Sequence, residues 1–481
     1  MKVLFVSWEL DPFFKFGGLG DVSRLLPHAL KNLGVDIANV LPFYNILKIN
    51  RIKRKRVGKF TVNYAGIMET VEVYKFIHPS TRVDVYVLKN EKYLSDAIKK
   101  DAFPFFNCAI VEMCKGAHMG WVPDIIHCND HHAGFIPLLV KEAKLPIKTI
   151  LTIHNMYYQG KYPETILHDM GVDKSKCRIL KWEAAGGQIN FMMECIIHAD
   201  IVNTVSPTYA KEIMKPEFGE GLDEVLRGKE GRVFGILNGI DLDRQNVMNT
   251  RHVLYPYITF NMEKIGINKN IKYYSWEDGK RLNKRYMQKK LKLKVDERIP
   301  LLAFIGRLVD PQKGMGILYR CLKNIDINKI ELVLLGTGSE VWEQQFQWMC
   351  TFYPKNVSCN FRFDSKLAAK IYAASDFIII PSKFEPCGLI QMFGMFYGTM
   401  PIAHKTGGLA DSITDEKNGF LFENYSAESL EHTMDKAVGL YHHERAKDKM
   451  MVENAMSTDF SWDKSVREYI VLYEKLMRGE Y

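Results

Sequence analysis

Short apolar runs alternate with amphipathic segments along most of the chain. The runs are apolar enough for buried strands, and the segments between them repeat apolar residues at helical spacing. In the first such unit, the run 3–6 is followed by a loop with three glycines and by a helical pattern over 22–33, for which Asp21 is the predicted N-cap. This alternation is typical of βαβ units and predicts an α/β fold with parallel sheets.

Two series of predicted strands indicate two doubly wound, Rossmann-like domains. The first series comprises 3–6, 125–127, 149–152 and 201–204, and the second comprises 300–306, 331–336, 377–381 and 401–403. A polar and aromatic stretch separates the two series, with a predicted hinge near 240–251. The final helical pattern, 461–477, has one apolar face and is expected to cross back onto the first domain. We therefore predict one domain at 1–245 with 460–481 and a second at 246–459.

Composition excludes several classes of protein. The chain has 481 residues, 47% of them hydrophobic and 25% charged, which is ordinary for a folded protein and argues against disorder. No apolar run approaches the ~20 residues of a membrane span, and the first run does not lead into a cleavage site. Nine cysteines without a CxxC pair favour a reducing compartment. We expect a cytoplasmic protein, or a plastid protein in a photosynthetic eukaryote, although no transit peptide is seen.

The net charge of +9 is mild for this length. Positively charged residues are most concentrated in the basic cluster at 51–59, which is interpreted as a solvated loop or sheet edge. The cluster contains no aromatic residue that would stack on bases, so we expect no nucleic-acid partner.

Two glycine-rich loops share one pattern, and each follows a predicted strand and precedes a helix. The first is Gly17-Gly18-Leu19-Gly20-Asp21 and the second is Gly407-Gly408-Leu409-Ala410-Asp411. Backbone amides at such a helix start can bind an anion, although a tight strand–helix turn explains either loop alone. Neither loop is a GxGxxG or P-loop motif. If the carboxyl edges of the two sheets oppose each other, both loops face one cleft that suits a pyrophosphate or sugar hydroxyls.

Charged side chains follow strands of the second series. Arg307 and Lys313 can neutralise a diphosphate. Glu385 can act in acid/base chemistry, bind a sugar hydroxyl or cap a helix. The histidine-rich stretch 127–132 and His154 allow a zinc site only if three or four ligands converge, and we expect no metal.

In combination, these motifs resemble those of the bacterial glycogen synthases and plant starch synthases, retaining glycosyltransferases of the GT-B fold. They occur in the family's order and span nearly the whole chain: 15–21, 154–155, 158–160, 206–210, 235–241, Arg307 with 312–314, 384–389, 406–411 and 460–462.

The resemblance implies transfer of glucose from a nucleotide diphosphate glucose, usually ADP-glucose, to the non-reducing end of an α-1,4-glucan. A synthase that uses UDP-glucose, or a related GT-B glucosyltransferase with a different acceptor, is the alternative. The expected partners are a nucleotide sugar and glycogen or other α-glucan chains, with no metal, no other cofactor and no membrane. The first domain would carry the acceptor side and the second the donor side, across a deep cleft. The oligomeric state is left open.

The resemblance also assigns roles to individual residues. The implied catalytic residues are Glu385, His154, Lys313 and Arg307. The implied donor-binding residues are Lys15, Gly17, Gly18, Asp21, Asn238, Gly336, Gly338, Phe363, Cys387, Gly388, Leu389, Gly407, Gly408 and Leu409. The implied acceptor or sugar contacts are Asp130, Asn155, Tyr158 and Gln159.

A few positions depart from the family pattern. His131 replaces a usual Trp, Ile390 replaces a frequent Thr, and Phe16 and Gly20 replace common Thr and Ala. These changes spare the charged residues but leave the choice between ADP and UDP open. A catalytically silent relative would have lost Lys15, Arg307, Lys313 or Glu385, all of which are present. Alanine at Glu385 or Lys313 is expected to abolish most transfer while leaving the fold intact.

Overall fold

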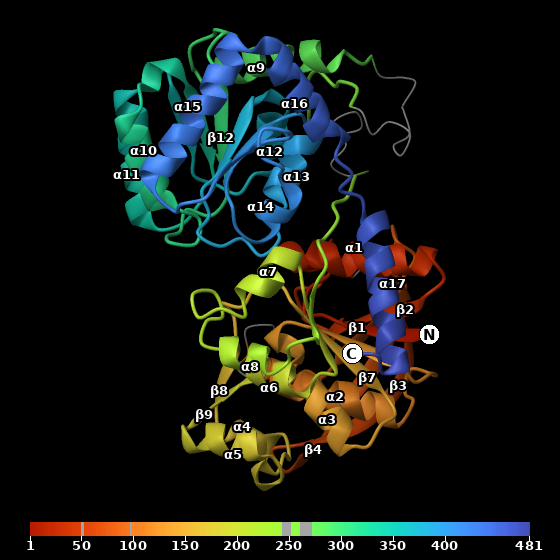
Figure 1. Ribbon diagram of the computed structural model, residues 1–481. Helices are drawn as coiled ribbons and strands as arrows, with labels where there is room; N and C mark the ends of the chain where they lie inside the picture. The colour runs from red at the N-terminus through yellow and green to blue at the C-terminus, as the bar shows by residue number, and fades with distance from the viewer. Residues whose placement is uncertain (50–51, 97–98, 100, 243–251, 260–271) are drawn as a thin grey trace. The chain divides into compact units, whose positions relative to one another are not determined.

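The computed structural model describes residues 1–49, 52–96, 99, 101–242, 252–259 and 272–481. Arg51 of the basic cluster, the predicted boundary between 245 and 246, and most of the predicted hinge lie outside these residues. The chain forms two compact units, which are unit 1, Met1–Asn238 with Trp462–Tyr481, and unit 2, Gly239–Ser461. Figure 1 shows that each unit has helices on both faces of a sheet, as the predicted α/β class requires.

Unit 1 is built on a nine-stranded sheet in the order β11-β10-β7-β6-β1-β2-β5-β4-β3. Its strands are β1 (Lys2–Val6), β2 (Asp36–Pro42), β3 (Lys55–Tyr64), β4 (Ile67–Ile77), β5 (Asp84–Lys89), β6 (Ile125–Asn129), β7 (Lys148–Ile153), β10 (Ile201–Thr204) and β11 (Val233–Gly235). The pairs β3–β4 and β4–β5 are antiparallel, and the other pairs are parallel. The basic cluster therefore runs into an edge strand, β3.

The helices of unit 1 cover both faces of this sheet. They are α1 (Gly18–Asn32), α2 (Ala102–Lys115), α3 (Ile136–Glu142), α4 (Ile166–Asp169), α5 (Arg178–Ala185), α6 (Phe191–His198), α7 (Pro207–Glu212), α8 (Asp223–Arg227) and α17 (Trp462–Arg478), with a small sheet of β8 (Lys161–Pro163) and β9 (Gln188–Asn190). Alternate strand residues point to opposite faces. Leu4 and Val6 pack in the core with α2, α3 and α6, whereas Val3 and Phe5 pack with α1 and α17.

The C-terminal helix α17 belongs to unit 1 and is anchored by buried hydrogen bonds as well as apolar contacts. The hydroxyl of Tyr473 lies 2.6 Å from Nδ1 of His127 on β6, and Asn203 on β10 donates to the hydroxyl of Tyr469 at 3.1 Å. Neutral, hydrogen-bonded polar groups at these positions fix the helix at one register on the sheet.

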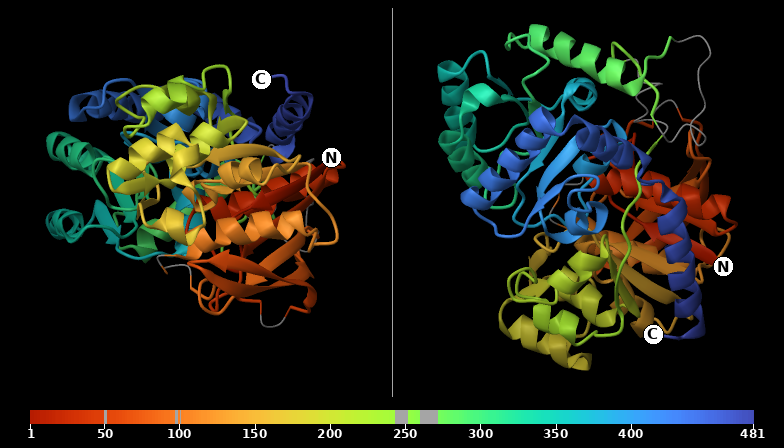
Figure 2. Two further views of the ribbon diagram at one scale, coloured as in Figure 1. Left: turned by 90° about the horizontal axis from the view of Figure 1, so that it is seen from below. Right: turned by 45° about the horizontal axis from the view of Figure 1, so that its top comes forward.

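Unit 2 is built on a six-stranded, all-parallel sheet in the order β14-β13-β12-β15-β16-β17. Its strands are β12 (Leu301–Ile305), β13 (Glu331–Leu335), β14 (Val357–Asn360), β15 (Phe377–Ile380), β16 (Met400–His404) and β17 (Phe420–Phe422). Its helices are α9 (Trp276–Lys290), α10 (Met315–Asn324), α11 (Glu340–Phe352), α12 (Ser365–Ala374), α13 (Ile390–Phe396), α14 (Gly407–Ser412), α15 (Ala427–His443) and α16 (Arg445–Ser457). One face packs on α10, α11, α15 and α16, and the tilted view in Figure 2 shows the helical layers around this sheet. The four strands predicted for the second series are all present.

Candidate active site

The carboxyl ends of four adjacent strands of unit 2 bring predicted catalytic and donor-binding residues to one edge of the sheet. Arg307 follows β12, Gly336 follows β13, Glu385 follows β15, and Gly407 begins α14 after β16. Since β13, β12, β15 and β16 are neighbours in that order, loops far apart in the sequence meet here. This edge is where open α/β sheets bind ligands.

Glu385 and Lys313 form an ion pair at this edge. Nζ of Lys313 lies 2.6 Å from Oε2 of Glu385, and the two side chains are 14% and 12% exposed. The hydroxyl of Ser382 donates to the same carboxylate oxygen at 2.9 Å. The pair joins residues 72 positions apart, and the role of Ser382 carries no signal in the sequence.

The second glycine loop packs directly on the backbone around Glu385. The amide of Gly408 donates to the carbonyl of Glu385 at 3.0 Å. A Cβ atom at Gly407 would lie 2.0 Å from the carbonyl oxygen of Glu385, and one at Gly408 would lie 1.9 Å from that of Cys387. Both positions therefore require glycine, and the loop fixes the backbone that carries the carboxylate. Gln391 adds to this support by donating to the carbonyls of Cys387 and Gly388, at 3.1 and 2.8 Å.

The loops after β12 and β13 are joined by backbone hydrogen bonds. Leu308 donates to the carbonyl of Thr337 at 2.9 Å, which holds the segment with Gly336 and Gly338 beside Arg307. The guanidinium of Arg307 donates to the side chain of Gln312 at 2.8 Å. Phe363, predicted to line the nucleoside, is 93% exposed and so has a ring face open to solvent.

In unit 1, the first glycine loop is held by a buried carboxylate that the sequence did not indicate. Oε2 of Glu9, a residue that is 2% exposed, accepts hydrogen bonds from the amides of Phe16 and Gly17, at 2.6 and 2.9 Å. Burial raises the pKa of Glu9, while the two amide bonds and Lys15 oppose that rise. The loop therefore has its geometry set before any ligand binds.

The prediction that Asp21 caps the helix after this loop is wrong. Helix α1 begins at Gly18, with Gly17 as its N-cap, so Asp21 lies within the first turn. Its carboxylate pairs instead with Nζ of Lys15 at 2.5 Å. The extended backbone at Gly17 and the hydrogen bonds to Glu9 start the helix earlier than the side-chain pattern indicated.

Asp130 and His154 meet at the carboxyl ends of β6 and β7. The amide of His154 donates to Oδ1 of Asp130 at 2.7 Å, and its Nε2 lies 2.9 Å from Oδ1 of Asn129. Burial raises the pKa of Asp130 to about 7 and lowers that of His154 to about 3. His154 is therefore a neutral hydrogen-bonding group at physiological pH.

The loop after β7 holds the remaining predicted acceptor contacts. Tyr158 is 46% exposed, whereas Gln159 is buried and its amide group bonds to Glu220 and Asn190, at 2.8 and 2.7 Å. The side chain of Asn155 accepts from the amide of Tyr157 at 3.0 Å. Gln159 therefore holds the loop in position, whereas the ring of Tyr158 is exposed enough to contact a ligand. Asn238, predicted to bind the donor, is buried at the C-terminal end of the first segment of unit 1.

Metal-binding clusters and membrane-spanning helices are both missing from the described ranges. Among those residues, no three His, Cys, Asp or Glu side chains are arranged to hold a metal ion. Nor does any described helix combine the length and the apolar character that a membrane span needs.

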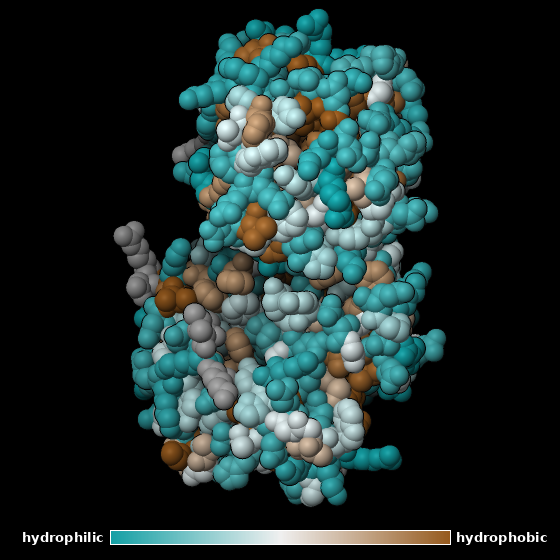
Figure 3. Space-filling view, turned by 90° about the vertical axis from the view of Figure 1, so that its left-hand side faces the viewer, coloured by the Kyte–Doolittle hydropathy of each residue, from teal (hydrophilic) through white to brown (hydrophobic). Residues whose placement is uncertain are grey.

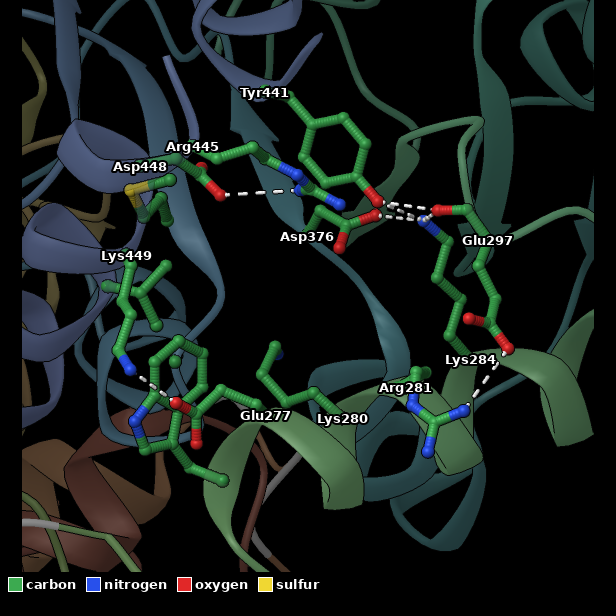
Figure 4. A pocket seen from close by; sticks show the side chains of 14 residues that line it. Glu277, Lys280, Arg281, Lys284, Glu297, Asp376, Tyr441, Arg445, Asp448 and Lys449 are labelled. Atoms are coloured by element: carbon green, nitrogen blue, oxygen red, sulfur yellow. Dashed lines mark hydrogen bonds and ion pairs between the residues drawn. The ribbon is translucent and has the colours of Figure 1, made fainter. Parts of the chain in front are cut away.

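A pocket of about 290 Å³ lies at the opposite, amino edge of the sheet in unit 2 (Figure 4). Its charges compensate one another. Lys284 pairs with Asp376 and Lys449 pairs with Glu277, each at 2.6 Å, and Lys280 donates to backbone carbonyls. This network ties α9 and α16 to the sheet, and its place is remote from the loops that carry Glu385.

The fold and these loops define a class of protein. Two doubly wound units, with glycine loops, a carboxylate and cations after their parallel strands, are the parts of a GT-B glycosyltransferase. The chain matches the family models for the starch synthase catalytic domain over residues 2–228 and for glycosyl transferases group 1 over residues 285–457.

Individual relatives narrow this class. The chain is 39% identical over 497 residues to the glycogen synthase of Thermosipho melanesiensis and 36% identical over 503 residues to that of Thermotoga maritima, with 99% of each chain covered. The catalytic domain of starch synthase IV from Arabidopsis thaliana, solved with ADP and acarbose, has a TM-score of 0.84 and 29% identity, with 99% of both chains covered. A sucrose-phosphate synthase from Thermosynechococcus elongatus, at TM-score 0.60 and 17% identity, with 99% of both chains covered, shares the fold.

The chain belongs to the family of bacterial glycogen synthases and plant starch synthases, and it is a glucosyltransferase of glycogen or starch synthesis. The sequence-based expectations of family, fold class and enzyme class are confirmed.

Proposed function

We propose that this protein transfers glucose from ADP-glucose to the non-reducing end of an α-1,4-glucan, with retention of the anomeric configuration. The observation that carries the proposal is the Lys313–Glu385 pair, set among glycine loops at the carboxyl edge of the sheet in unit 2. The related starch synthase was solved with ADP and acarbose, which fits a nucleotide diphosphate and a sugar chain as ligands.

Unit 2 is proposed to hold the donor. Arg307 and Lys313 neutralise the diphosphate as it leaves, which supplies the positive charge without a metal ion. Glu385 faces the transferred glucose, and backbone groups of the 387–389 and 407–409 segments hold its hydroxyls. Gly336, Gly338 and the exposed ring of Phe363 are proposed to line the nucleoside, where the ring stacks on adenine.

We propose a front-face reaction. The bond between the glucose C1 and the leaving phosphate oxygen breaks, the acceptor hydroxyl oxygen bonds to C1 from the same face, and the hydroxyl proton passes to the departing phosphate. Glu385 stabilises the oxocarbenium-like glucose electrostatically. A glycosyl-enzyme trapped on Glu385 would show instead that this carboxylate is the nucleophile.

Unit 1 is proposed to carry the acceptor side. Neutral His154, Asp130 and Asn155 offer hydrogen bonds to sugar hydroxyls, and Tyr158 offers a partly exposed ring to a glucan chain. The loop with Lys15, Gly17, Gly18 and Asp21 is assigned to the donor phosphates and glucose. We further propose a cytoplasmic location and glycogen as the polymer, which the similarity to bacterial glycogen synthases supports.

The test is to incubate the full-length protein with glycogen and either ADP-glucose or UDP-glucose, and to measure which nucleotide diphosphate is released. We expect ADP release to be faster at equal donor concentration and to be lost in Glu385→Gln. Faster UDP release would overturn the choice of donor. Absence of glucose incorporation from both donors would overturn the proposed function.

A further inference from the structure

Helix α11 of unit 2 carries two exposed aromatic rings in contact with each other. Trp348 is 49% and Phe352 is 59% exposed, and their ring centroids are 4.2 Å apart with a tilt of 43°. The other side of the helix is anchored by Phe346 and Met349, which are buried in the core of unit 2. Trp348 and Phe352, the α11 platform, are therefore fixed on a well-packed helix and face outward.

The segment that carries the platform is uncharged between Glu343 and Lys355. Gln344, Gln345 and Thr351 share its face of the helix at spacings of three, four and seven residues. No charged residue occurs from 344 to 354, whereas a segment of that length would carry about three at the chain's average composition. The side of unit 2 on which α11 lies in Figure 1 faces the viewer in Figure 3, where apolar patches interrupt a mostly hydrophilic surface.

We propose that the α11 platform binds an α-glucan chain at a second site, separate from the loops that carry out transfer. This inference rests on the proposed function, which supplies a long neutral polysaccharide as the substrate. The carbon–hydrogen faces of glucose rings are apolar and pack on aromatic rings, and neighbouring amides bond to the hydroxyls at the ring edge. The lack of charge disfavours a nucleic acid or a strongly charged protein as the occupant.

A second glucan site would act through local concentration. A glycogen particle carries many chain ends, so a chain held on α11 keeps other ends of the same particle near the enzyme. The effect is confined to polymeric acceptors, because a short oligosaccharide that leaves the platform is not tethered to the reacting chain. A loss of activity that is confined to polymeric acceptors therefore distinguishes a defect in the platform from a defect in the transfer site.

The test uses the full-length double variant Trp348→Ala/Phe352→Ala. We expect its affinity for glycogen, measured by co-sedimentation without nucleotide, to fall about tenfold, with a similar rise in the KM for glycogen. The kcat and KM with a short malto-oligosaccharide should stay unchanged. Met450→Ala, which removes a 53% exposed apolar side chain from α16, is the matched control. Trp348→Tyr/Phe352→Tyr should keep most of the affinity because the rings remain.

Several outcomes would overturn the proposal. Unchanged glycogen affinity in the alanine variant would do so, as would an equal loss with the short acceptor. A change of oligomeric state in sedimentation velocity would assign the platform to a contact between copies of this chain. If the alanine variant does not fold, a folded tyrosine variant that no longer binds glycogen would also overturn it. Glycogen binding through the platform by a protein that transfers no glucose would refute only the proposed function.

Discussion

Replacing Lys313 by methionine tests both the site and the stability of unit 2. The variant leaves the Glu385 carboxylate, which is 12% exposed, without its ion-pair partner at 2.6 Å. Breaking a fully buried pair in this way costs about 3–5 kcal/mol, and the residual exposure reduces our expectation to about 2–3 kcal/mol. For a unit of this size, that corresponds to a fall of about 4–12 °C in the unfolding midpoint. The fold itself should remain intact at ambient temperature, because a loss of this size lowers the midpoint without unfolding the unit.

The second half of the test is a double-mutant cycle with Glu385→Gln. Because the glutamine side chain is neutral, the double variant should recover part of the stability lost in Lys313→Met, with a coupling energy of about 1–2 kcal/mol. In turnover, each single variant should lose about 10²–10³-fold or more, and the double variant should be little worse than the poorer single variant. Calorimetry of the full-length protein and release of nucleotide diphosphate measure the two effects.

Lys405→Met is the matched control for this cycle. Lys405 pairs with Glu423 at 2.7 Å in the same unit, but the two side chains are 50% and 73% exposed, so solvent screens the pair and its loss should lower the unfolding midpoint far less than the loss of Lys313. If Lys313→Met melts no lower than this control, the buried pair does not stabilise the fold as argued. If it retains wild-type turnover, Lys313 does not act on the diphosphate.

Three further changes have distinct outcomes. Glu9→Gln should raise the KM for the nucleotide sugar about tenfold by loosening the first glycine loop, and an unchanged KM would remove Glu9 from the site's support. Gly408→Ala should abolish turnover and lower the melting temperature, since a Cβ would lie 1.9 Å from the carbonyl oxygen of Cys387; a fully active variant would contradict that packing. Burial lowers the pKa of His127 from 6.5 to about 3 in the folded protein. The neutral imidazole therefore contributes folding stability that is fully present above pH 6.5 and is lost as the pH falls toward 3. His127→Gln should therefore reduce the slope of unfolding free energy against pH, between pH 4 and 6, by about 1.4 kcal/mol per unit, and an unchanged slope would show that the imidazole titrates normally.

The sequence predicted those parts of the molecule that depend on local pattern. Four of the six strands of unit 2, β12, β13, β15 and β16, appear as apolar runs because they are buried in a parallel sheet. The edge strands β14 and β17 were not predicted, since β14 contains polar residues and β17 has only three residues. The sequence could not predict contacts that depend on tertiary packing. The Lys313–Glu385 pair spans 72 positions, and Glu9 acts on a loop through backbone amides that leave no side-chain pattern.

The antiparallel extension of the sheet in unit 1 was also missed. Strands β3 and β4 alternate buried and exposed residues over part of their length, whereas the predictions relied on continuous apolar runs. In β3, the run of basic residues at its start hid an alternation that begins only at Phe60. A search with period two over 55–77 would have detected the hairpin.

In each unit, a carboxylate of the protein pairs with hydrogen-bond donors that belong to the proposed donor-binding site. Glu9 accepts from amides of the first glycine loop, and Glu385 holds Lys313. Leaving such donors unpaired in partly buried sites would cost folding free energy, whereas pairing them internally keeps their geometry fixed. If the diphosphate binds at Lys313 as proposed, Lys313 exchanges one anionic partner for another, and the gain in affinity for the bound donor should be small. Charge that grows on the departing phosphate would strengthen the new contact, so Lys313 would favour the transition state over the ground state.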